Sequence, residues 1–319
     1  MRKIIIDTDT GSDDAVAILM ALRDPSVQVL ALTTVCGNVS LEQATINALR
    51  SVKEARTYAP PVYKGAYHPL VRTTRNATQA HGDDGMSGLG TLPEGMQAET
   101  EHAVEAMLRL VKENPGEVEI VAIGPATNVA LAMMKDPETM KQVKHIYSMG
   151  SGGFGPGNVT SVAEFNVFVD AEAYKIMVEF PVPVTIVGFD ICRAEGACFS
   201  EAEMTKMKKD GPVSKFAMDC TAALVDYNEL KHGKREIDLA DPFAMGAALW
   251  PDTVAEAPAC CCLVCAETGM TYGQVVVSEN RYAGADAEKL GDWAVNATVV
   301  KRMDNALFKK KLRDTLKTQ

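Results

Sequence analysis

Short apolar runs alternate with longer segments of helical periodicity through most of the chain. The apolar runs predict strands at residues 4–6, 27–35, 118–123, 143–148 and 184–187. Segments whose apolar residues recur every three to four positions predict helices at residues 14–22, 41–56, 98–112, 126–134 and 171–178. This alternation is typical of an α/β fold, in which helices cover both faces of a mostly parallel open sheet.

Other segments extend or interrupt this rhythm. Residues 213–231 form one further helical run, and residues 309–317 predict a basic terminal surface helix whose Leu312 and Leu316 could serve an oligomer interface. Residues 67–95 show little periodicity, and residues 150–158 hold five glycines. Because long irregular loops in an α/β fold tend to be functional, we expect these two loops near a ligand. Since no internal repeat or low-complexity linker divides the chain, we expect one domain over residues 1–319.

The charge and length of the chain exclude several classes of partner. The 319 residues carry 42 acidic and 32 basic side chains, a formal net charge of −10, which does not suit nucleic acid. No apolar run reaches the roughly 18 residues that a membrane helix needs. Asp7 interrupts the first apolar run too early for a signal-peptide core, so we expect a cytoplasmic protein.

Eight cysteines are present, four of them in the segment 260–265. That segment contains one C-x-x-C spacing, but no second pair or nearby histidine completes a zinc site. It lies in the apolar run 259–266, which predicts a buried strand. We therefore interpret these cysteines as small hydrophobic residues.

The sequence Asp-Thr-Asp-Thr-Gly-Ser-Asp-Asp at residues 7–14 carries the strongest chemical signal. Asp7 and Asp9 follow directly after the first apolar run, and Asp13 and Asp14 begin the first predicted helix. Capping of the helix accounts for one or two of the four carboxylates, but not for all of them. Crowded carboxylates repel one another unless a cation is bound, and oxygen ligands suit Ca²⁺ or Mg²⁺. A solvated acidic turn is the weaker interpretation.

Six segments in the same order resemble the signatures of the inosine-uridine-preferring nucleoside hydrolases. The first is DTDTGSDDA at residues 7–15, close to the family pattern DxDxGxDDA. The others are TVCGN at 34–38, HGDDG at 81–85, GPATN at 124–128, AEFN at 163–166 and the late Asp241-Pro242 pair. Each segment alone is a weak signal, and their shared order identifies the chain as a member of the family.

The resemblance implies the fold, the cofactor and the metal ligands. It implies a Rossmann-like nucleoside hydrolase fold and a bound Ca²⁺ that is used to cleave N-glycosidic bonds of ribonucleosides with water. The implied calcium ligands are Asp9, Asp14, Asp241 and the backbone carbonyl of Thr127, with Asp7 supporting them from behind. Asp9 would also act as general base on the water bound to the metal.

The resemblance further implies which residues contact the substrate. Because cleavage builds up positive charge on the sugar, carboxylates and amides around the ribose stabilise the transition state. The residues that match ribose-binding or substrate-binding positions are Asp13, Asn38, Met149, Asn158, Glu164, Phe165 and Asn166. For Asn158, ordinary turn chemistry is a serious alternative. His81 would contact the base and is a second candidate catalytic residue.

The chain departs from the family pattern at the leaving-group position. Many members carry a histidine directly before the late Asp-Pro pair, and this chain has Ala240 there. His232 is a hypothetical substitute acid, with a histidine at the surface end of a helix as the plainer interpretation. Thr10 stands where proline is common in the family, and either residue fits the turn.

Two alternatives stay open at this point. A Mg²⁺-dependent phosphatase of the haloacid dehalogenase type would use Asp7 as nucleophile, but its order after Asp9 would be Gly-Thr rather than Thr-Gly. A non-catalytic, calcium-dependent riboside-binding protein would need no leaving-group acid. The sequence does not select the base, and a modified or non-nucleoside N-riboside remains open. The resemblance implies a homo-oligomer, a dimer or a tetramer.

Overall fold

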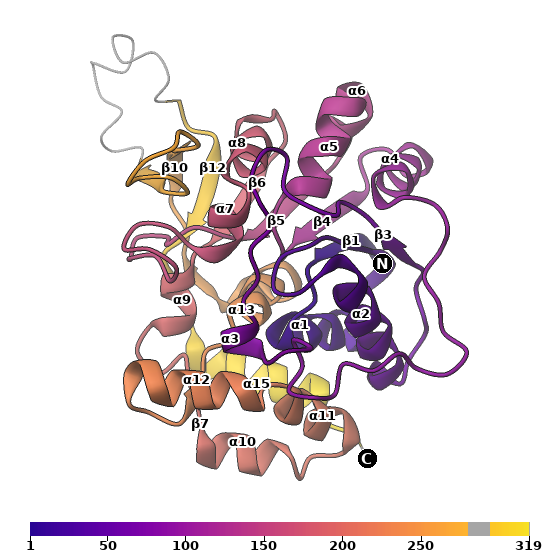
Figure 1. Cartoon of the computed structure of the whole chain (residues 1–319), viewed down its shortest axis with the longest axis vertical. Coiled ribbons are helices and arrows are strands. Elements are labelled where there is room, and N and C mark those ends of the chain that lie inside the picture. Colours follow the sequence, from indigo (N-terminus) through magenta and orange to yellow (C-terminus); the bar gives the residue numbers. More distant parts are fainter. Residues whose placement is uncertain (280–293, 319) are drawn as a thin grey trace.

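A nine-stranded sheet forms the centre of the molecule in the computed structural model, which describes residues 1–279 and 294–318 (Figure 1). Its strand order is β11-β10-β12-β6-β5-β4-β1-β2-β3. The strands are β1 Arg2–Thr8, β2 Val27–Thr34, β3 Val62–Lys64, β4 Val118–Ala122, β5 His145–Met149, β6 Val184–Val187, β10 Ala259–Val264, β11 Val275–Glu279 and β12 Ala297–Val300. All neighbouring pairs are parallel except those of β10 with β11 and β12.

Helices cover both faces of this sheet, and short elements complete the fold. The helices are α1 Ser12–Arg23, α2 Leu41–Ala55, α3 Thr78–His81, α4 Ala103–Glu113, α5 Thr127–Lys135, α6 Pro137–Met140, α7 Phe165–Val169, α8 Ala171–Glu179, α9 Phe189–Arg193, α10 Glu201–Met207, α11 Pro212–Cys220, α12 Ala222–His232, α13 Ala240–Leu249 and α15 Asn305–Leu316. A 3₁₀ turn spans Pro251–Thr253. Two small sheets pair β7 Phe199–Ser200 with β8 Glu236–Ile237 and β9 Val254–Glu256 with β13 Arg302–Met303. The predicted single-domain α/β fold with a mostly parallel sheet is confirmed.

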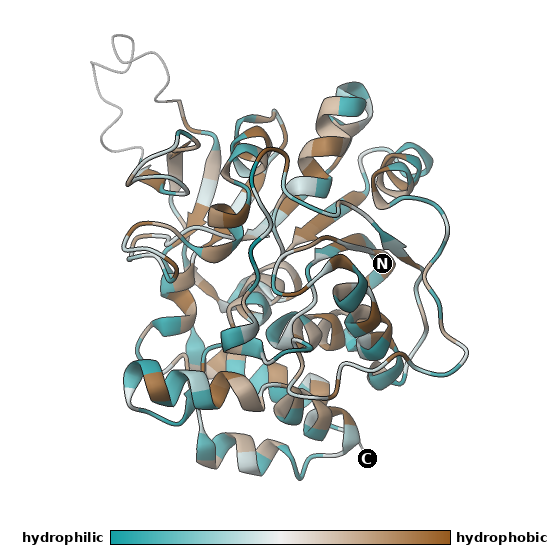
Figure 2. Cartoon of the chain, in the orientation of Figure 1, coloured by the Kyte–Doolittle hydropathy of each residue, from teal (hydrophilic) through white to brown (hydrophobic). Residues whose placement is uncertain are grey.

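Two hydrophobic cores lie on opposite faces of the sheet. Ile4 and Ile6 of β1 pack into the core shared with α1, α2, α13 and α15, whereas Ile5 packs into the core of α4, α5 and α8. This division follows from the strand geometry, because successive side chains point to opposite faces. In Figure 2 the covering helices carry a hydrophobic and a hydrophilic side, as amphipathic helices on a sheet must.

The strand order reverses between β1 and β4. From β1 the chain adds β2 and β3 on one side, and then returns to add β4, β5 and β6 on the other. At such a reversal the connections leave in opposite directions and open a crevice at the carboxyl ends of the strands, where ligands bind in open α/β sheets. The acidic segment 7–14 and the segment 123–127 both begin at this crevice.

Several predicted boundaries were wrong. The helical run predicted at 213–231 is two helices, because the backbone leaves the helical conformation at Thr221 (φ −92°, ψ 9°). The Thr221 hydroxyl donates a hydrogen bond to Met218 O at 3.2 Å at this break. The apolar pattern continues across this break and therefore hides it. The helix predicted from residue 98 begins only at Ala103, since Glu99 donates its amide to Val62 O and joins the strand region.

The C-terminal helix α15 also differs from its prediction. Leu312 and Leu316 are fully buried in the core beside α1 and α13, together with Phe308. Their apolar face is therefore covered by this chain itself and is not a free oligomer interface.

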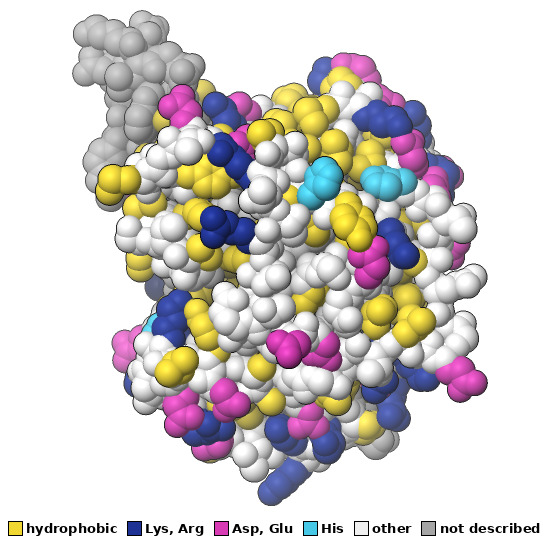
Figure 3. Space-filling model, viewed as in Figure 1, with side chains coloured by type: hydrophobic (Ala, Val, Ile, Leu, Met, Phe, Trp, Pro, Cys, Tyr) yellow, Lys and Arg dark blue, Asp and Glu magenta, His cyan; other side chains and the backbone are white. Residues whose placement is uncertain are grey.

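The apolar strand prediction at 259–266 is confirmed in its main part. Cys260, Cys261 and Cys262 of β10 are buried, as expected for cysteines used as small hydrophobic residues. Among the described helices, none has the length and apolar character needed to cross a bilayer. On the face seen in Figure 3, basic and acidic side chains are interspersed over the surface rather than gathered in one basic patch.

Candidate functional site

Asp7 is the second-last residue of the first strand and is fully buried. Its Oδ1 accepts hydrogen bonds from Thr33 Oγ1 at 2.6 Å and from Asn128 Nδ2 at 2.8 Å, which join β1 to β2 and to the start of α5. Burial raises the pKa of Asp7 to about 6, although both donors act in the opposite direction. Asp7 thus fixes three elements that meet at the crevice.

Asp9 lies just beyond β1, where the chain turns toward α1. Its Oδ2 accepts the backbone amide of Asn38 at 2.6 Å, whereas its Oδ1 is buried without a hydrogen-bond partner. Burial, and then the charge of Asp14, hold the pKa of Asp9 well above its usual range. An unpaired buried carboxylate oxygen is costly, and a bound cation would remove that cost.

Two glycines allow the backbone to approach Asp9 closely. A Cβ atom added at Gly37 would overlap Asp9 Oδ2, and one at Gly124 would lie 2.8 Å from the amide nitrogen of Asp9. Both glycines follow strands adjacent to β1 in the sheet, so the pocket around Asp9 is built from three strand ends.

Asp13 and Asp14 lie in the first turn of α1 and are both buried. Asp14 accepts hydrogen bonds from Thr8 Oγ1 at 2.6 Å, the amide of Gly11 at 2.9 Å and Asn38 Nδ2 at 3.0 Å. The bond to Gly11 caps the helix, as the sequence predicts for one of the four aspartates. The bonds from Thr8 and Asn38 orient the carboxylate further.

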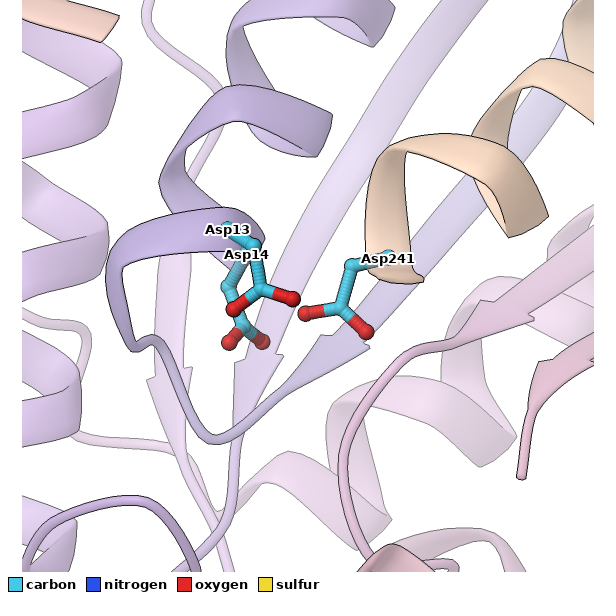
Figure 4. Close-up of side chains that lie close together, drawn as sticks. All are labelled: Asp13, Asp14 and Asp241. Carbon is cyan, nitrogen blue, oxygen red and sulfur yellow. The ribbon is translucent and has the colours of Figure 1, made fainter. Parts of the chain in front are cut away.

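Asp241 joins these aspartates from the first turn of α13, far from them in the sequence (Figure 4). The carboxylates of Asp13, Asp14 and Asp241 offer oxygen atoms within 4.8 Å of one another. Burial raises the pKa of Asp241 well above its usual range, and the charges of the other aspartates raise it further. Three buried carboxylates in one place, with the unpaired Asp9 Oδ1 beside them, fit a hard divalent cation.

A cavity of about 260 Å³ opens directly above this cluster. The predicted residues that line it are Asp13, Asn38, His81, Met149, Asn158, Glu164, Phe165, Asn166 and Asp241. Asp7, Asp9, Asp14 and Thr127 are buried and do not line it. Asp13 and Asp241 therefore form the acidic floor of the cavity above the buried Asp9 and Asp14, and the other predicted lining residues form its wall.

Glu164, Asn166 and Met149 form one hydrogen-bonded part of this wall. Glu164 caps α7 by accepting the amides of Asn166 at 2.9 Å and Val167 at 3.2 Å. Burial raises its pKa to about 7. The side-chain amide of Asn166 donates to Ile123 O at 3.0 Å and to Met149 O at 3.3 Å, which fixes both residues at the ends of β4 and β5.

His81 reaches the cavity from the short helix α3 in the irregular region 67–95. Its Nδ1 lies 2.8 Å from Ser12 Oγ and 3.7 Å from Asp13 Oδ1. Burial lowers the pKa of the imidazole, so the neutral form is favoured. His81 is thus held beside the acidic floor.

Asn158 shows both of the properties that the sequence left open. Its Oδ1 accepts the amide of Phe165 at 2.9 Å, which is turn chemistry within the glycine-rich loop. It also lines the cavity, and its carbonyl oxygen accepts a hydrogen bond from Lys231 Nζ at 3.1 Å.

Helix α12 adds cavity residues that the sequence did not single out. Tyr227, Asn228 and Lys231 line the cavity, as does Asp238, which accepts Asn228 Nδ2 at 2.7 Å. No short motif marks these positions, because a helix side chain reaches the cavity only after α12 has packed against α3 and β8. Ala240 and the exposed His232 line the cavity as well.

The fold and the site define a class: an α/β protein with an open, mostly parallel sheet, and with an acidic cluster that fits a cation below a small-molecule cavity at the strand reversal. The sequence model of the inosine-uridine preferring nucleoside hydrolases matches residues 4–310. The chain belongs to this family. It is therefore an N-glycosyl hydrolase of ribonucleosides, and the phosphatase and binding-protein alternatives are set aside.

Individual relatives agree with this placement. The chain is 36% identical over 252 residues to the probable uridine nucleosidase 1 of Oryza sativa subsp. japonica, covering 78% of this chain and 77% of that protein. It is 31% identical over 298 residues to the pyrimidine-specific ribonucleoside hydrolase RihB of Escherichia coli K12, covering 92% and 94%. The solved structure of the plant nucleoside hydrolase PpNRh1 superposes with a TM-score of 0.91 at 30% identity, covering 100% and 99%.

Proposed function

We propose that this protein hydrolyses the N-glycosidic bond of ribonucleosides to ribose and free base with the help of Ca²⁺. The observation that carries the calcium proposal is the unpaired, buried Oδ1 of Asp9 beside the carboxylates of Asp13, Asp14 and Asp241. Without a cation these groups repel one another at neutral pH.

The proposed ligands are Asp9, Asp14, Asp241 and the backbone carbonyl of Thr127. Asp7 lies behind them and supports the arrangement through Thr33 and Asn128. The N-termini of α1 and α13 lie at the cluster and favour its negative charge. When bound, calcium would orient the ribose hydroxyls and lower the pKa of the attacking water.

The chain's own residues would bind the sugar and move the proton. Asp9 is the proposed general base that accepts a proton from the attacking water at its carboxylate. Asp13, Asn38, Asn158, Glu164 and Asn166 would surround the ribose, and their negative charge and dipoles would stabilise the cationic sugar. Met149 and Phe165 would pack against it, and His81 would contact the base.

One relative is named as a uridine nucleosidase and another as a pyrimidine-specific ribonucleoside hydrolase. These names favour pyrimidine ribonucleosides, and uridine in particular, as substrates. We extend this preference to the present chain, with purine ribonucleosides as the competing substrates.

The test is ribose release from a panel of purine and pyrimidine ribonucleosides, measured as reducing sugar. Asp9→Asn keeps the volume of the side chain and removes the base, so we expect kcat to fall about 10²- to 10⁴-fold. Asp252→Asn is the matched control, since Asp252 is a surface residue that pairs with Lys311 at 2.6 Å. Equal rates for Asp9→Asn and wild type would contradict the proposed role. Ribose release that persists in the presence of a strong chelator would contradict the proposed calcium dependence.

Three further proposals concern the whole molecule. We propose that residues 1–319 act as one domain, because the acidic cluster draws on both ends of the chain. We propose a cytoplasmic location, supported by the buried thiols of Cys36, Cys192 and Cys220, which form no disulfide. We propose a homo-oligomer, a dimer or a tetramer, on the family resemblance. Sedimentation velocity tests the last of these, and a monomer at micromolar concentration would contradict it.

A further inference from the structure

Helix α12 forms part of the cavity wall and contributes one permanently charged cation, Lys231. Among the described residues that line the cavity, Lys231 is the only lysine or arginine, whereas Asp13, Glu164, Asp238 and Asp241 are acidic. The aspartates at the floor are buried and Lys231 is exposed, so the ammonium group lies at the mouth. A nucleoside whose ribose lies on the buried aspartates would place its base toward the mouth of the cavity, where Lys231 lies.

Two hydrogen bonds hold the Lys231 ammonium in position. Nζ donates to Asn158 O at 3.1 Å and to Tyr227 Oη at 3.2 Å, and it lies 5.3 Å from the centroid of the Tyr227 ring. An ammonium group has three N–H donors, and these bonds use two of them. One donor is therefore left for a ligand in the cavity.

The neighbouring candidates are less suited to meet a leaving base. Ala240 has no proton to give, although it lines the cavity where many family members carry histidine. His81 uses Nδ1 for its hydrogen bond with Ser12, so it would contact the base through its other ring nitrogen and without a permanent charge. His232 is exposed for the most part, and its slight burial together with the nearby charge of Arg193 lowers its pKa and thus the share of the charged imidazolium at neutral pH.

A permanent positive charge near the leaving base would assist the reaction. When the bond from C1′ to the base nitrogen breaks, its electron pair departs with the base. The oxygen of water joins C1′, and the departing base finally takes up one proton for the one that water has lost. A base with ring carbonyls, such as uracil, spreads the departing charge onto its carbonyl oxygens. A nearby ammonium group lowers the energy of that anion.

We propose that Lys231 donates to the departing base and stabilises it as an anion. Lys231 thereby takes the place of a leaving-group acid in this chain. The inference rests on the proposed hydrolase function and adds to it the residue that stabilises the leaving base.

The test compares uridine with 5-fluorouridine in wild type, Lys231→Met and Lys231→Arg. Fluorine makes the base a better leaving group that needs less stabilisation. We therefore expect Lys231→Met to lower kcat/KM for uridine about 10- to 100-fold and to lower it much less for 5-fluorouridine. Lys231→Arg keeps a cation and should retain most of the activity on uridine. Lys234→Met, which removes an exposed lysine outside the cavity, should match wild type on both substrates.

The outcomes separate the two proposals. An equal fall on both substrates would mean that Lys231 only holds the Asn158 loop, and it would overturn the inference while leaving the hydrolase function intact. Unchanged rates in Lys231→Met would overturn it as well, and a specific loss of uridine hydrolysis in His232→Ala would assign the role to His232. Absence of ribose release by wild type from every nucleoside would instead overturn the proposed function, and the inference with it.

Discussion

The carboxylates of Asp14 and Asp241 come from segments 227 residues apart in the sequence and lie with oxygen atoms within 4.8 Å of each other. Each stands in the first turn of a helix, α1 and α13, and the two helices pack against each other in the same hydrophobic core. The repulsion between these carboxylates destabilises the folded state when no metal is bound. A bound cation removes this repulsion, so metal binding should raise the stability of the protein.

Asp241→Asn should therefore separate the stability of the metal-free protein from that of the calcium-bound protein. Removing one of three crowded charges should raise the melting temperature without metal. It should also largely abolish the gain on adding Ca²⁺, which for wild type is about 3 kcal/mol at a hundredfold excess over Kd. Differential scanning fluorimetry with chelator and with calcium measures both effects. Asp252→Asn should keep the full gain, and a full gain in Asp241→Asn would contradict its role as a ligand.

Gly37→Ala should disturb the acidic site through packing alone. The added Cβ would overlap Asp9 Oδ2, and Asp9 cannot withdraw because Asn38 and the end of β1 hold it. We expect a loss of about 1–3 kcal/mol in the free energy of unfolding, together with weaker calcium binding. Urea unfolding and calcium titration measure the two effects. Gly269→Ala is the control, because nothing lies within 4 Å of its added Cβ, and equal behaviour of both variants would refute the argument.

Asp190 should make the stability of the protein depend on pH. Its Oδ2 accepts the amide of Phe154 at 2.9 Å and its Oδ1 is buried without a partner, so burial raises its pKa to about 6. Between about pH 4, the usual value for aspartate, and pH 6, the folded state keeps a proton that the unfolded state has released. The contribution of Asp190 to the free energy of unfolding is therefore lost as the pH rises through this window, by up to about 3 kcal/mol.

Asp190→Asn should remove this slope. Asp7 and Asp13, whose pKa values burial also raises to about 6, titrate in the same window. The informative quantity is thus the difference between wild type and variant in urea unfolding from roughly pH 4 to pH 7. We expect the free energy of unfolding of the variant to increase relative to that of wild type as the pH rises. Curves that stay parallel would show that Asp190 does not titrate differently on folding.

Phe308→Ala tests whether α15 is part of the core. The Phe308 ring is fully buried and stacks on Phe243 of α13, with ring centroids 4.0 Å apart and planes at 21°. We expect a loss of about 3–5 kcal/mol, since the cavity left behind cannot collapse between packed helices. Leu230→Ala, at an 88% exposed position, should change stability little. A small effect of Phe308→Ala in urea unfolding would mean that α15 is only loosely attached.

Local sequence determined the elements and the acidic segment of this protein. The apolar run of β1, the turn at Gly11 and the aspartates that begin α1 follow from short-range periodicity and capping, and the structure has them as predicted. The family signatures added Asp241 and Glu164, which the structure places at the floor and in the wall of one cavity. These are properties of neighbouring residues or of a pattern shared along the chain, so they are readable without coordinates.

Tertiary packing alone decided the rest. The break at Thr221, the burial of Leu312 and Leu316, and the position of Lys231 at the mouth of the cavity have no mark in the sequence. Each depends on which surface a helix meets after the sheet has formed, and helical periodicity gives the face of a helix but not its partner. For the same physical reason the sequence could show that Ala240 leaves the base without the usual acid, but only the packing of α12 brings forward a residue to replace it.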